Sequence, residues 1–384
     1  MIIKNVNIIT RNKILNNYCI EINDGIITNI AKDISTDNYI DGLGRFLSPG
    51  FVDMHIHGGG GYDFLDENIE TYQKITYAHM IHGTTSMVPT LVASSIEDLK
   101  KAIIRYKNAK DYKCNLLGLH LEGPYLNRVQ CGAINVDYLH NPDIEEINGL
   151  IELANGAITR VTLAPELANL DELIKLLKEN NITVSIGHSN ATFDVVKDAY
   201  KNGATLITHF YSGCSSITRK NGYRILGIIE AGYLIDDLDI EIIADGSHLS
   251  IDLLKYIYKF KNHEHISLIT DAMRAAGTNL KETYLGKMGE GTPCVIEDGV
   301  AKLKDRSAFA GSIATCDLLV KNMLKAGVGL NDAINMVTIN PIKALGSKYK
   351  KGEIKVGNDA DIVLFDENID TSLVIINGEI TYKK

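Results

Sequence analysis

Two histidines, His55 and His57, stand two positions apart directly after the apolar segment 46–52. In a β-strand, side chains at positions i and i+2 share a face, so the two imidazoles converge on one point. Converging imidazole nitrogens are typical of a metal site. A lone His-x-His pair is equally compatible with two polar residues at a strand end, so a metal site needs support from further residues.

Further segments place a histidine or an acidic residue at the end of a short, apolar, β-branched run, where a strand gives way to a loop. These residues are Glu122, His188, His209 and Asp271. The same arrangement therefore recurs along most of the chain. We predict a metal centre assembled from several strand ends.

Strands and helices alternate in the middle of the chain, most clearly between residues 161 and 211. The expected elements there are a strand at 161–163, a helix from 170, a strand at 182–186, a helix at 193–201 and a strand at 205–210. Such repeats fit a (β/α)8 TIM-like barrel, whose active site lies at the carboxyl ends of the strands. A doubly wound open sheet is the alternative, but no Gly-x-Gly-x-x-Gly follows the first strand.

Both ends of the chain are rich in strand signals, and neither has enough strands to bury a face alone. We therefore predict an α/β fold in which residues 49–346 form the barrel. Residues 1–48 and 347–384 together form a small β-sandwich domain built from both termini.

The bulk composition excludes several classes of protein. The 384 residues carry a net charge of -9, and the Lys and Arg residues are dispersed, so neither nucleic-acid binding nor a polybasic membrane patch is expected. The six cysteines are widely spaced, and the N-terminal sequence does not resemble a signal peptide, which together favour a cytoplasmic protein. An anionic substrate would need a local binding site.

The ordered motifs resemble the amidohydrolase superfamily, and within it the branch that deacetylates N-acetyl amino-sugar phosphates. The similar segments are 49–58, 120–124, 187–189, 208–209, 244–248, 270–272 and 357–366. Because they extend over nearly the whole chain, they are far more specific than any one motif. The resemblance implies a metal-dependent deacetylase.

The resemblance also implies the ligands. Glu122, His188 and His209 would supply one carboxylate and two imidazoles, a set that leaves a position open for water. His55 and His57 would bind a second metal, so we predict one or two divalent ions. Zn is the first expectation, and Fe, Mn, Co or Ni suit the same ligands.

Asp271 would be the catalytic residue, taking a proton from the attacking water and returning it to the leaving amine. Its alternative role is a helix N-cap. Family members bind the phosphate through backbone amides, here at Ser212 and Gly213, and a basic residue, here Arg224 or Lys220. The predicted substrate-binding residues are Ala133, Ser212, Gly213, Arg224, His248, Ala310, Gly311 and Ser312.

The implied reaction is hydrolysis of the acetamide of N-acetylglucosamine 6-phosphate to glucosamine 6-phosphate and acetate. The chain departs from the family at Ser212-Gly213 and at Ile134, where a histidine is common, so N-acetylgalactosamine 6-phosphate is the alternative substrate. A non-catalytic scaffold is a remote alternative, because no metal ligand is missing. A homodimer is usual among relatives and is expected here.

Overall fold

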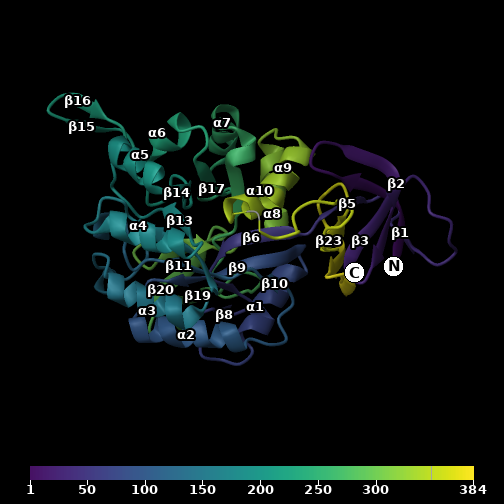
Figure 1. Ribbon diagram of the computed structural model, residues 1–384, viewed down its shortest axis with the longest axis horizontal. Helices are drawn as coiled ribbons and strands as arrows, with labels where there is room; N and C mark the ends of the chain where they lie inside the picture. Colours follow the sequence, from purple (N-terminus) through teal and green to yellow (C-terminus); the bar gives the residue numbers. More distant parts are fainter. Residues whose placement is uncertain (347) are drawn as a thin grey trace.

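The computed structural model describes residues 1–346 and 348–384. Figure 1 shows a helix-covered barrel on one side and a sheet holding both chain termini on the other. Within the described part of the chain, no helix is both long and apolar enough to span a membrane.

Parallel strands form the barrel, in the order β6, β9, β11, β12, β13, β14, β17 and β18. Their bounds are β6 Phe51–Ile56, β9 Thr84–Val92, β11 Leu119–Glu122, β12 Ile158–Leu163, β13 Thr183–Ile186, β14 Ala204–Ile207, β17 Asp239–Ile243 and β18 Ile266–Ile269. Every residue of β6, β9 and β12 is buried, as expected where helices cover one face and the barrel interior lies on the other.

The barrel is closed between β18 and β6 by the side chain of Asp53. Its carboxylate accepts hydrogen bonds from the backbone N–H of Thr270 at 3.2 Å and from the Thr270 hydroxyl at 2.5 Å. The backbone N–H of Asp271 donates to the carbonyl of His55 at 2.9 Å. The first and last barrel strands, and the functional residues at their ends, are thereby fixed to each other.

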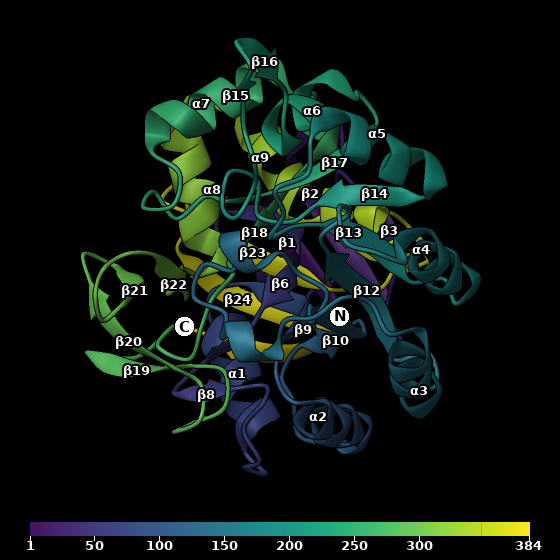
Figure 2. The same ribbon diagram turned by 90° about the vertical axis from the view of Figure 1, so that its left-hand side faces the viewer.

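Helices surround these strands, as Figure 2 shows. The α-helices are α1 Thr71–Met80, α2 Ile96–Asn108, α3 Ile144–Ala154, α4 Leu170–Glu179, α5 Phe193–Asn202, α6 Ile228–Leu234, α7 Ile251–Phe260, α8 Cys316–Lys325, α9 Leu330–Val337 and α10 Ile339–Ala344; short 3-10 helices span Arg128–Gln130, Val136–Tyr138 and His263–His265. Helix α4 illustrates why these segments are helical and pack on the barrel. Its buried residues recur at helical spacing and form one apolar face; they are Leu170, Leu173, Ile174 and Leu177.

Strands from both termini form one sheet in the order β25, β24, β23, β5, β1, β2 and β3, with β4 beside β1. Their bounds are β1 Ile2–Ile9, β2 Ile14–Asn23, β3 Ile26–Ala31, β4 Ile40–Asp41, β5 Phe46–Pro49, β23 Ile362–Phe365, β24 Thr371–Ile376 and β25 Glu379–Lys383. Apolar side chains from β1, β2, β3, β5, β23 and β24 meet in one buried cluster. The predicted fold class, a TIM-like barrel with a terminal β domain, is confirmed.

The remaining strands are short and lie in the connections between the barrel elements. They are β7 Gly58–Gly59, β8 Tyr62–Asp63, β10 Asn115–Leu116, β15 Thr218–Lys220, β16 Tyr223–Ile225, β19 Glu282–Leu285, β20 Thr292–Glu297, β21 Val300–Leu303 and β22 Phe309–Ser312. Strands β19 to β22 form an antiparallel sheet that was not predicted from the sequence. Hairpin β15–β16 projects from the barrel at the upper left of Figure 1.

Candidate active site

Six predicted residues meet at the carboxyl end of the barrel. His55 lies on β6 and His57 directly after it, and Glu122 is the last residue of β11. The remaining residues, His188, His209 and Asp271, follow β13, β14 and β18. All six residues are buried, and none of them is more than 7% exposed to solvent.

The ligand atoms form two groups, each within 4.8 Å: His55, His57 and Asp271 in one, and Glu122, His188 and His209 in the other. In the second group, Glu122 Oε1 lies 3.1 Å from His188 Nε2 and 3.0 Å from His209 Nε2. Atoms bound to one ion at about 2.0–2.2 Å stand roughly 3–3.5 Å apart. The spacing therefore suits a divalent metal.

Glu122 also connects the two groups. Its Oε2 lies 3.3 Å from His57 Nε2, and its Oε1 lies 3.6 Å from His55 Nε2. In the first group, Asp271 Oδ1 is 3.1 Å from His57 Nε2 and 3.5 Å from His55 Nε2. One carboxylate thus faces both groups, an arrangement that can serve one ion or two.

The ring orientations fit metal binding. The Nδ1–H of His188 donates to the Gln130 carbonyl at 2.7 Å, and that of His209 to the Ser212 carbonyl at 3.0 Å. Such bonds place the proton on Nδ1 and leave Nε2 available as a ligand. His55 Nε2, moreover, is buried without a hydrogen-bond partner among the described residues.

The buried carboxylates of the site also favour a bound cation. Burial lowers the pKa of His57, but contacts with Asp271 and Glu122 raise it more, to well above its usual range. Burial raises the pKa of Asp271, yet the neighbouring His55 and His57 lower it to about 2. Two buried carboxylates therefore demand nearby positive charge, which protonated imidazoles or a divalent ion would supply.

A cavity of about 220 Å³ opens above these residues. Its lining includes the predicted residues Ala133, Ser212, Gly213, His248 and Gly311, together with Gly132, Ile134, Leu285, Ala308 and Phe309. His248 is held by Asp245, whose Oδ2 lies 2.8 Å from its Nδ1, and its ring centre is 4.7 Å from that of Phe309. Strand β22 thus forms a wall of the site.

Other predicted substrate residues lie outside this lining. Ala310 is buried in an apolar cluster of the β19–β22 sheet, and the Ser312 hydroxyl donates to the carbonyl of Thr270. Arg224 and Lys220 are exposed on the projecting hairpin. Their side chains therefore do not reach the cavity of their own barrel.

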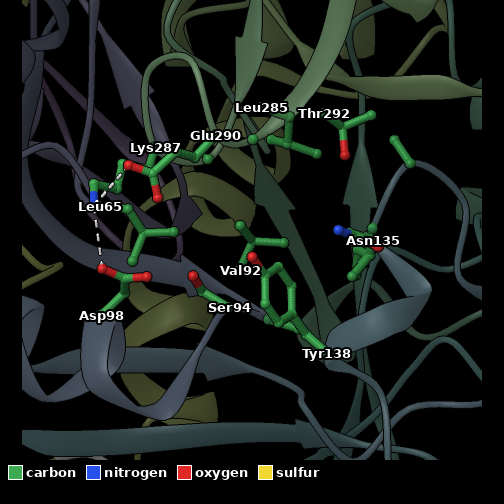
Figure 3. A pocket seen from close by; sticks show the side chains of 15 residues that line it. Leu65, Val92, Ser94, Asp98, Asn135, Tyr138, Leu285, Lys287, Glu290 and Thr292 are labelled. Atoms are coloured by element: carbon green, nitrogen blue, oxygen red, sulfur yellow. Dashed lines mark hydrogen bonds and ion pairs between the residues drawn. The ribbon is translucent and has the colours of Figure 1, made fainter.

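Leu285 and Gly132 also line the cavity but were not predicted from the sequence, since no chemical motif marks them. Leu285 also borders a neighbouring pocket, which shares Ala133 and Ile134 with the main cavity. Figure 3 shows that Lys287 lies beside this pocket and pairs with Asp98 and Glu290. The residues that line both pockets are apolar.

The barrel and its strand-end residues define a hydrolase-like protein with a candidate metal centre. The model of the amidohydrolase family matches residues 46–381, and the chain belongs to that family. It is 33% identical over 378 residues to the N-acetylglucosamine-6-phosphate deacetylase of Lysinibacillus sphaericus, covering 96% of this chain and 94% of the relative. It is 30% identical over 387 residues to the N-acetylgalactosamine-6-phosphate deacetylase of Shewanella sp., covering 98% and 94%.

Solved structures agree with this assignment. The N-acetylglucosamine-6-phosphate deacetylase of Pasteurella multocida superposes with a TM-score of 0.91 at 29% identity, covering 100% of this chain and 99% of that one. A mutant of the Mycobacterium smegmatis enzyme in complex with N-acetyl-D-glucosamine-6-phosphate also gives a TM-score of 0.91, at 27% identity with the same coverage.

Proposed function

We propose that this protein hydrolyses the acetamide of N-acetylglucosamine 6-phosphate, releasing acetate and glucosamine 6-phosphate. The observation that carries the proposal is Glu122, a buried carboxylate facing four histidines at the floor of an open cavity. The relatives named above, which extend over nearly the whole chain, act on this class of substrate.

The ligands proposed for the primary metal are Glu122, His188 and His209. His55, His57 and Asp271 would hold a second ion, and Zn is the metal we expect first because the donors are imidazole and carboxylate. A bound divalent ion would polarise the acetyl carbonyl and make the attacking water more acidic.

Asp271 is the proposed proton carrier. In its ionised form this carboxylate can accept a proton from water. It lines the cavity, so it can pass that proton to the sugar nitrogen as the C–N bond breaks. His248, fixed by Asp245, would orient the substrate from the loop after the neighbouring strand β17.

The phosphate site is proposed at the loop after His209. The Ser212 N–H already donates to the His209 carbonyl at 2.8 Å, whereas no partner of the Gly213 N–H occurs among the described residues. The Gly213 amide is therefore the better anion donor. Arg224 can contribute only if the hairpin of one protomer reaches the cavity of another, which would make the expected homodimer part of the site.

The alternative substrate, N-acetylgalactosamine 6-phosphate, is favoured by one observation. The cavity wall near Ile134 and Leu285 is apolar, so it offers no side-chain hydrogen bond with which to distinguish sugar epimers.

Acetate release from a panel of acetylated amino sugars, with and without the 6-phosphate, tests both substrates. The reaction should be fastest with N-acetylglucosamine 6-phosphate and detectable with its epimer. Protein that contains bound metal but releases no acetate from either phosphate would overturn the proposal.

A further inference from the structure

A buried ion pair lies in the barrel interior beneath the candidate metal centre. Arg160, on β12, and Glu241, on β17, are both fully buried and pair through two nitrogens and two oxygens. The Arg160 Nη2 also donates to the hydroxyls of Thr208 at 2.9 Å and Ser185 at 3.2 Å. Neither charged residue lines the cavity, so neither can contact substrate.

Glu241 touches both ligand groups through a single oxygen. Its Oε2 lies 3.3 Å from the Nδ1 of His55, in the first group. The same atom accepts the backbone N–H of His209, in the second group, at 3.3 Å. The His209 backbone has a φ of 27°, outside the regions that side-chain-bearing residues prefer, so it needs such restraint.

We infer that Glu241, held in place by Arg160, is a positioning residue that fixes His55 and His209 relative to each other and so sets the geometry of both proposed metal sites. The inference rests on the metal ligands proposed above. Arg160 contacts both carboxylate oxygens of Glu241 and thereby fixes the orientation of this carboxylate. An ionised Oε2 accepts the Nδ1–H of His55, and the His55 Nε2 then points at the metal position.

Metal affinity measured on paired variants tests this inference. Replacing both members of a buried pair avoids leaving one charge unpaired, so we compare Arg160→Met/Glu241→Leu with Arg160→Met/Glu241→Gln. The Gln variant keeps an oxygen that can accept the His55 proton, and the Leu variant does not. The metal affinity of each variant is measured by equilibrium dialysis with Zn. The geometry of its metal ligands is followed by the visible spectrum of the Co-substituted protein.

We expect the Leu variant to bind the ion at His55, His57 and Asp271 about 10–100-fold more weakly than wild type, the usual effect of losing a residue that orients a ligand. The Gln variant should retain most of the affinity. Thermal unfolding of the metal-free proteins verifies that both variants fold. Ser185→Ala is the control, because it removes a hydrogen bond from Arg160 without touching a ligand.

Wild-type affinity and an unchanged Co spectrum in a folded Leu variant would overturn the inference, as would a loss in the Gln or the Ser185→Ala variant as large as that in the Leu variant. If the double variants do not fold, Glu241→Asp retains the charge but withdraws the oxygen from His55, and it must weaken the same ion. Wild-type protein that binds no metal would instead overturn the proposed function.

Discussion

Replacing Asp271 with asparagine separates proton transfer from binding of the primary metal ion. The side chain keeps its size, so its contact with His57 Nε2, 3.1 Å in the wild type, can persist, but the amide cannot carry a proton. A positioned acid or base contributes about 10²–10⁴-fold to a rate, equal to roughly 2.7–5.4 kcal/mol of activation free energy. We therefore expect kcat to fall at least ~10²-fold while KM changes little.

The assay is acetate release from N-acetylglucosamine 6-phosphate, first with the metal bound on purification and then with excess metal, together with elemental analysis of the same samples. The ion at Glu122, His188 and His209 should be retained, because Asp271 belongs to the other ligand group. Asp198→Asn is the control, because this carboxylate lies on the outer helix α5, its side chain is 69% exposed and it does not line the cavity.

Two results would refute the role of Asp271. One is an Asp271→Asn variant that keeps more than about a tenth of the wild-type kcat. The other is recovery of the full rate when excess metal is added, since Asp271 would then serve only as a ligand.

Other predictions concern the metal, the substrate and stability. Glu122→Gln should lose bound metal and activity together; elemental analysis that finds full metal and an unchanged rate would contradict the ligand assignment. Removing the 6-phosphate should lower kcat/KM by about 10²-fold or more, because charge-assisted hydrogen bonds contribute ~1.5–3 kcal/mol each; equal values would exclude an anion site. Burial lowers the pKa of His79 to about 4, below the ~6.5 of an unfolded chain, so unfolded protein binds the proton first as pH falls. The free energy of unfolding should therefore drop by about 2 kcal/mol between pH 8 and pH 5 from this group, and denaturant titrations of His79→Gln should show a smaller drop.

Sequence alone predicted the residues that approach one another at the carboxyl end of the barrel. The reason is geometric: parallel strands in this fold deliver their ends to one face, so Glu122 and Asp271 meet although far apart in the chain. The closing contact between β18 and β6, made through Asp53, was not predictable from composition, because an acidic residue beside His55 resembles another ligand.

Arg160 and Glu241 could not be recognised from sequence. Each interrupts an apolar strand, a pattern also typical of a strand with one exposed face. Only closure of the barrel shows that both point into the dry interior, where each compensates the other's charge. The β19–β22 sheet was not predicted because its strands are short, with only four to six residues each. The position of Arg224 on a hairpin depends on the direction of a loop, which the periodicity of the sequence does not indicate.

The pairing of β5 with β23 has a consequence for how this protein is made. Phe46 to Pro49 lie antiparallel to Ile362 to Phe365, so the amino-terminal strands acquire this neighbour only when the last part of the chain leaves the ribosome. Until then β5 carries an open edge, which can pair with another unfinished chain. Shortening the carboxyl terminus before β23 should therefore damage the opposite end of the molecule, and aggregation during synthesis would be its first sign.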